Sequence, residues 1–133
     1  VVTGTQGAQA SAVELWHAPT GERVRKVDLP AGFVPSAFDP QASRVAVARE
    51  GDYPSVEILS VDDGSSIVTI AARVRPTSLA FNRSGEWLAG CVRDEIGKDA
   101  AIVAWDAATG DEVSRVDLPS GAEIFRLHFD SQD

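Results

Sequence analysis

Short apolar stretches alternate with polar turns along the whole chain. Each stretch has about five to seven residues, and Gly, Asp, Ser and Pro cluster between them, which is typical of β-strands joined by tight turns. No stretch of ten or more residues carries an apolar stripe at helical spacing. The pattern therefore predicts an all-β protein with twelve strands, at residues 1–6, 12–17, 22–29, 34–39, 44–49, 55–61, 66–72, 76–82, 87–92, 101–105, 112–118 and 124–130.

The strands repeat with a period of about 44 residues. Trp16, Leu59 and Trp105 end similar segments that are 43 and 46 residues apart. A second series agrees, because Phe38, Phe81 and Phe129 are 43 and 48 residues apart. Two independent series with one period indicate a repeat architecture in which each unit contributes four antiparallel strands.

The segment 102–110, IVAWDAATG, carries the most specific signal, a Trp-Asp pair that ends the third strand of a unit. With the period and the four strands per unit, it resembles the WD40 repeat, within the wider class of WD40/YVTN-like β-propellers. Trp16-His17 and Leu59-Ser60 stand where the other units would have Trp-Asp. The resemblance implies that strands run from the innermost to the outermost position of each blade, and it offers Asp99 and Asp52 for the family's turn aspartate.

Read in this order, the chain is a single propeller segment of about three blades. Residues 1–29 supply the last three strands of one blade, 34–72 and 76–118 are full blades, and 124–130 is the first strand of the next. Closed propellers have about four to eight blades, so three cannot close a ring. Either the chain is a fragment of a longer propeller, which the absence of methionine favours, or several copies assemble into a ring.

Composition narrows the class of partner. The 133 residues carry 12 basic and 20 acidic side chains, a net charge of −8, and this balance argues against a nucleic-acid-binding protein. No apolar run is long enough to span a membrane as a helix, and residues 1–10 do not resemble a signal peptide. The single cysteine, Cys91, excludes an intrachain disulfide and points to a reducing compartment such as the cytoplasm.

The residue types that most often act in catalysis or metal binding are interpreted here as structural. His17 replaces the Asp of a Trp-Asp pair, His128 lies in an expected inner strand, and Cys91 lies in a buried apolar strand. The acidic run at 62–64 aligns with two other hairpin turns and lacks the spacing of a calcium loop. No phosphate-binding or nucleophile-elbow motif is present, so we expect no catalytic, metal or cofactor site.

Two charged loops, at 49–54 and 93–99, join the second and third strands of successive blades. Each holds an apolar or aromatic residue, so Tyr53 and Ile96 are candidate partner-contact residues at one rim. The starts of the inner strands are expected at the opposite rim near the axis, where Arg73 and Arg75 could engage an acidic peptide.

These features favour a scaffold or regulatory platform for a protein or peptide partner, without its own catalysis. The alternative is a segment of a propeller enzyme or cofactor-binding propeller of the lactonase, YVTN or quinoprotein type. Such a site needs converging polar ligands at the starts of the inner strands, and Glu123 is the sole acidic residue there. A further alternative is a sensor segment of a larger signalling protein. The partner and the total number of blades are left open.

Overall fold

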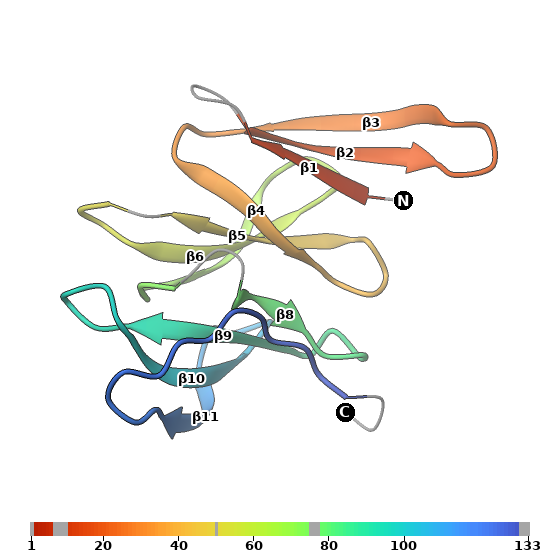
Figure 1. Cartoon of the computed structure of the whole chain (residues 1–133). Coiled ribbons are helices and arrows are strands. Elements are labelled where there is room, and N and C mark those ends of the chain that lie inside the picture. Colours follow the sequence, from red (N-terminus) through yellow and green to blue (C-terminus); the bar gives the residue numbers. More distant parts are fainter. Residues whose placement is uncertain (1, 7–10, 50, 75–77, 131–133) are drawn as a thin grey trace.

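The computed structural model describes residues 2–6, 11–49, 51–74 and 78–130. Over these ranges it contains eleven strands in three antiparallel sheets and no α-helix, which confirms the all-β class. The described part of the chain therefore holds no helix that could cross a membrane. Figure 1 shows the three sheets stacked one above another, and the ring is not closed.

Each sheet is a meander in which every strand pairs with the next strand along the chain. The first sheet contains β1 (Val2–Gln6), β2 (Ser11–His17) and β3 (Glu22–Leu29). The second contains β4 (Phe33–Phe38), β5 (Arg44–Arg49), β6 (Ser55–Ser60) and β7 (Ser66–Ile70). The third contains β8 (Ala80–Phe81), β9 (Trp87–Arg93), β10 (Asp99–Asp106) and β11 (Glu112–Asp117).

The last two strands of every sheet are joined by the same hairpin turn. Gly21, Gly64 and Gly110 each have a positive φ, between 68° and 80°, and each donates its N–H to the carbonyl four residues earlier. Glycine adopts this left-handed conformation without steric cost, so the repeated Gly fixes where each hairpin reverses. The turn at 62–64 is thus a hairpin, as predicted.

Alternation along the strands gives every sheet two faces, and the core lies between sheets. Val13, Val45 and Leu59 belong to a buried cluster between the first and second sheets. Ile58 and Trp105 belong to a larger cluster between the second and third sheets. The sheets stack in chain order. We call the face of each sheet that points in the direction from the first sheet to the third its forward face, and the opposite face its rear face. In β10, Val103 and Trp105 are buried on the rear face while Ile102 and Ala104 lie on the forward face.

The strand predicted at 124–130 is not formed. This segment runs as irregular chain across the forward face of the third sheet, seen in dark blue in Figure 1. It borders a small apolar cavity of about 210 Å³ lined by Ala80, Ala89, Ile102, Ala104, Leu127, His128 and Phe129. The segment thus has the place of an innermost strand, but the structure assigns it no β-ladder.

The inner strand predicted at 76–82 is also shorter than expected. The structure assigns only Ala80–Phe81 to β8, and residues 75–77 lie outside the described residues. Just before β8, the hydroxyl of Ser78 accepts the backbone N–H of Cys91 at 3.0 Å, so a side chain makes the contact to β9 there.

We expect Ala42→Gly to stabilise the protein. Ala42 has a φ of 56° in the turn between β4 and β5, and the equivalent residue 43 positions later is Gly85, with a φ of 77°. A left-handed alanine is strained and glycine is not, so the free energy of unfolding should rise by about 0.5–1 kcal/mol. Urea unfolding measures this. The control is Ala108→Gly, in a turn where φ is not positive, which should be neutral or destabilising.

Candidate functional site

The loops of the three sheets gather at two rims. The loop rim carries the β5–β6 loop, the β9–β10 loop and the β7–β8 connection, on the left in Figure 1. The turn rim carries the hairpin turns that follow β2, β4, β6, β8 and β10.

The starts of the inner strands lie on the loop rim, so their expected position at the opposite rim is wrong. Phe33, the first residue of β4, pairs with Arg49, the last of β5. Likewise, the carbonyl of Arg73 accepts the N–H of Arg93 at 2.8 Å. In an antiparallel pair the start of one strand adjoins the end of its neighbour, which places exposed Arg73 beside the β9–β10 loop. Arg75 lies outside the described residues.

Ile96 stands at the tip of a tightly held loop. The Asp94 carboxylate accepts the backbone N–H groups of Ile96 and Lys98 at 3.1 and 2.8 Å. The backbone N–H of Asp94 also donates to the carbonyl of Lys98, and the carbonyl of Asp94 accepts the N–H of Gly97. Gly97 has a φ of 80°. The side chain of Ile96 is 76% exposed, so the loop presents an aliphatic group on an ordered support.

Tyr53 has the corresponding place on the second sheet and is 77% exposed. Its loop turns at Gly51, whose φ is 115°. At the base of the loop the Arg49 guanidinium lies 5.8 Å from the ring centre of Phe33, in the range of a cation–π contact. The structure thus brings Tyr53, Ile96 and Arg73 to one rim.

Asp99 ties the β9–β10 loop to the C-terminal segment. Its buried carboxylate accepts the N–H of Ile124 at 2.7 Å and lies 3.8 Å from Nε of Arg93. The aspartate that the resemblance singled out therefore fixes where residues 124–130 begin to cross the third sheet. A charged acceptor on a backbone N–H is a strong restraint in a buried place.

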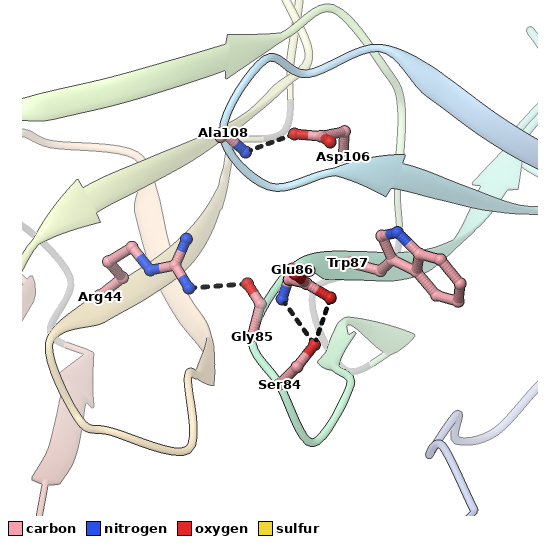
Figure 2. Close-up of a pocket in the computed structure, with 7 residues that line it drawn as sticks. All are labelled: Arg44, Ser84, Gly85, Glu86, Trp87, Asp106 and Ala108. Carbon is pink, nitrogen blue, oxygen red and sulfur yellow. Dashed lines mark hydrogen bonds between the residues drawn. The ribbon is translucent and has the colours of Figure 1, made fainter. Parts of the chain in front are cut away.

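A polar cleft of about 390 Å³ opens on the turn rim between the second and third sheets, as Figure 2 shows. Its lining residues are Arg44, Ser84, Gly85, Glu86, Trp87, Asp106 and Ala108. Several of their polar groups are already bonded: Ser84 Oγ contacts Glu86, and the Asp106 carboxylate accepts the N–H groups of Ala108 and Thr109. Those backbone hydrogen bonds hold the pKa of Asp106 below its ordinary value of 3.8.

Arg44 links the two sheets at the bottom of this cleft. It donates from Nη2 to the carbonyl of Gly85 at 2.6 Å and from Nε to Asp39 at 3.2 Å. Its guanidinium also lies 5.6 Å from the ring centre of Phe81. One side chain therefore joins the β4–β5 turn to the β8–β9 turn of the next sheet.

The buried Asp39 carboxylate organises its own turn. Burial raises its pKa, but hydrogen bonds from the backbone and side chains of Arg44 and Ser43 outweigh burial and leave the pKa below 3.8. Asn82 repeats the role 43 residues later: its Oδ1 accepts the N–H of Trp87 at 3.0 Å, as Asp39 accepts that of Arg44 at 2.9 Å.

The sequence alone did not assign a role to these two residues. The available signal was their equal offset from Phe38 and Phe81, since an Asx residue directly after a strand commonly caps the following turn.

The structure also places the two histidines and the cysteine that the sequence analysis considered. His17 Nδ1 lies 3.0 Å from Thr20 Oγ1 within the β2–β3 turn, and Cys91 is buried in β9. His128 is exposed beside the apolar cavity of the third sheet. Among the described residues, no group of three or more His, Cys, Asp or Glu side chains is placed to hold a metal ion.

The fold resembles β-propellers of known structure. Hydrazine synthase from Kuenenia stuttgartiensis superposes with a TM-score of 0.59 at 16% identity, over 80% of this chain and 30% of that chain. The β-propeller domain of the trilobed protease from Pyrococcus furiosus, which has an open velcro topology, gives 0.58 at 13% identity, over 90% and 39%. BamB from Moraxella catarrhalis gives 0.57 at 11% identity, over 90% and 39%.

No family model and no curated protein sequence matches the chain. Identities this low establish the fold alone: the chain is a β-propeller segment. It spans 30–39% of the length of these three propeller-containing chains.

We expect Asp39→Asn to destabilise the protein by about 1–3 kcal/mol near neutral pH, because the amide nitrogen cannot accept the hydrogen bonds of Ser43 and Arg44. A carboxyl with a lowered folded pKa contributes stability above its unfolded pKa and loses it as pH falls through the folded pKa. The difference from wild type should therefore shrink as pH falls below 3.8. Urea unfolding across pH measures it. Asn82→Asp is the matched variant and should acquire a pH dependence of the same sign.

Proposed function

We propose that this β-propeller segment is a protein-binding platform and that the loop rim is its contact surface. The observation that carries the proposal is the pair of large apolar side chains, Tyr53 and Ile96, exposed at equivalent loops of neighbouring sheets. Exposed aromatic and aliphatic groups on ordered loops are typical anchors of protein interfaces.

The surroundings of these two side chains support a protein or peptide partner. The loops that present them carry both signs of charge, with Arg93 and Lys98 beside Asp94 and Glu95. Exposed Arg73 adds a guanidinium to the same rim, suited to an acidic group of the partner. A charged periphery around apolar anchors is the usual composition of a transient interface.

The assignment of the repeats to the WD40 type is part of the same proposal. It is supported by Asp106 of the Trp-Asp pair, which caps the β10–β11 turn through the N–H groups of Ala108 and Thr109. It is also supported by Asp99, which lies buried at the end of the β9–β10 loop. In this proposal the platform acts by binding, without catalysis and without a cofactor.

We expect Tyr53→Ala combined with Ile96→Ala to weaken partner binding by more than about tenfold, because interface energy concentrates in a few apolar anchors. The melting temperature should be unchanged, since both side chains are exposed. Photo-crosslinking residues at 53 and 96 identify the partner first, and the affinity of purified variants is then measured.

The matched control is Val24→Ala combined with Val113→Ala, which removes two exposed apolar side chains of the outer strands. These substitutions should leave the affinity at the wild-type value. Equal affinities for the loop variant and wild type would exclude the loop rim as the contact surface.

A further inference from the structure

We propose that the loop rim recognises a short extended segment of its partner in which one acidic residue stands between two apolar residues, and that Arg73 binds the acidic one. The inference rests on the proposed function, in which Tyr53 and Ile96 are the apolar anchors. It adds the charge, order and spacing of the partner residues that these three side chains meet.

The β7–β8 connection passes from the loop that carries one anchor to the loop that carries the other. Ile70, the last residue of β7, pairs with Val56, the second residue of β6, so the connection starts beside the β5–β6 loop. Three residues later, the carbonyl of Arg73 accepts the N–H of Arg93, the last residue of β9, at 2.8 Å. Arg73 therefore lies between the β5–β6 loop and the β9–β10 loop.

The backbone at Arg73 is held in place while its side chain is open to a partner. The next residue, Val74, is only 2% exposed and forms a β-bridge with Val92 of β9. Arg73 itself is exposed, and its guanidinium makes no ion pair or hydrogen bond with the described residues. A guanidinium can bind a carboxylate through two parallel hydrogen bonds, which makes this side chain suited to an acidic residue of the partner.

The acidic composition of the chain makes an uncompensated arginine informative, because 20 acidic residues face only 12 basic ones. The neighbouring charges are engaged within the protein: Arg93 lies 3.8 Å from the buried carboxylate of Asp99, and the Asp94 carboxylate accepts two N–H groups of its own loop. The ion pairs within the described ranges engage Arg23, Arg25, Lys26, Arg44, Arg93 and Arg115. Arg73 thus keeps its charge for a carboxylate outside the chain.

The distance between the two loops sets the spacing of the partner residues. Sheets that face one another are typically about 10 Å apart, and three residues of extended chain span about the same length. An extended segment of the partner therefore passes from Tyr53 to Ile96 in about three residues, with Arg73 between them. We expect its two apolar residues three or four positions apart, on either side of the acidic one.

Selection from a random peptide library displayed on phage tests the proposal on the full chain. Sequences enriched against the wild type should hold an acidic residue between two apolar residues. Against Arg73→Glu, the same position should instead be occupied by Lys or Arg, because the charge that it meets is reversed. Enriched sequences with no acidic residue between the apolar ones would overturn the proposal.

The affinity of one enriched peptide, measured by fluorescence polarisation, tests the contact directly. Replacing its acidic residue by the corresponding amide should weaken binding to the wild type by about tenfold, and Arg73→Gln should weaken binding of the unchanged peptide by a similar factor. The two changes together should cost no more than either alone, because both remove one contact. Losses that multiply would contradict a direct contact between the two groups.

The matched control is Arg83→Gln. Arg83 is also exposed and has no ion pair in the part of the chain that the structure describes, but it lies in the β8–β9 turn on the opposite rim. Its replacement changes the net charge by the same amount as Arg73→Gln and should leave the affinity at the wild-type value, since salt screens distant exposed charges. An equal loss in both variants would show that net charge rather than a contact at Arg73 decides binding.

The double variant Tyr53→Ala and Ile96→Ala separates this inference from the proposed function. Peptides that bind the double variant weakly but Arg73→Gln as tightly as the wild type would overturn only the contact assigned to Arg73. Peptides that bind the double variant as tightly as the wild type would exclude the loop rim and the contact together. A library from which the wild type enriches no sequence would contradict both proposals.

Discussion

The close approach of the β6–β7 and β10–β11 turns to the outer strand of the preceding sheet is the constraint on which this architecture depends. At Gly64 and Gly110 an added Cβ would meet Val27 and Val68 at less than 3.0 Å, so the sheets can stack at this spacing only with glycine in the turn. The spacing in turn allows the alternating side chains of facing strands to form two continuous apolar layers. The period of the sequence is therefore the period of this contact.

Polar side chains complement the apolar layers at the edges of the stack. Arg25 reaches the carbonyl of Asp62 at 2.9 Å, and Arg44 reaches the carbonyl of Gly85 at 2.6 Å. Each arginine joins one sheet to a turn of the next. The turn rim thus carries hydrogen bonds between sheets, whereas Tyr53 and Ile96 on the loop rim are exposed.

Much of this fold could be predicted because its signals are local. Alternation and turn residues placed β5 at its observed bounds, and the Trp and Phe series indicated the repeat that the structure shows as three sheets. Predictions that needed a partner strand were less secure: residues 124–130 have the pattern of a strand but no ladder, and β8 is only two residues long. For the candidate site, sequence identified exposed loop residues but misplaced Arg73, because the rim follows from strand direction.

The sequence by itself determined the all-β class and the hairpin glycines, since each depends on residues a few positions apart, and the recurrence of these local patterns determined the repeat. Only the tertiary structure decided which faces of the sheets are covered, because the exposure of Trp16 and Val116 depends on sheets far away in the chain. The roles of Asp39 and Arg44 were decided at the same level. Their hydrogen bonds join two turns about 40 residues apart, and no local pattern specifies which sheet an arginine will reach.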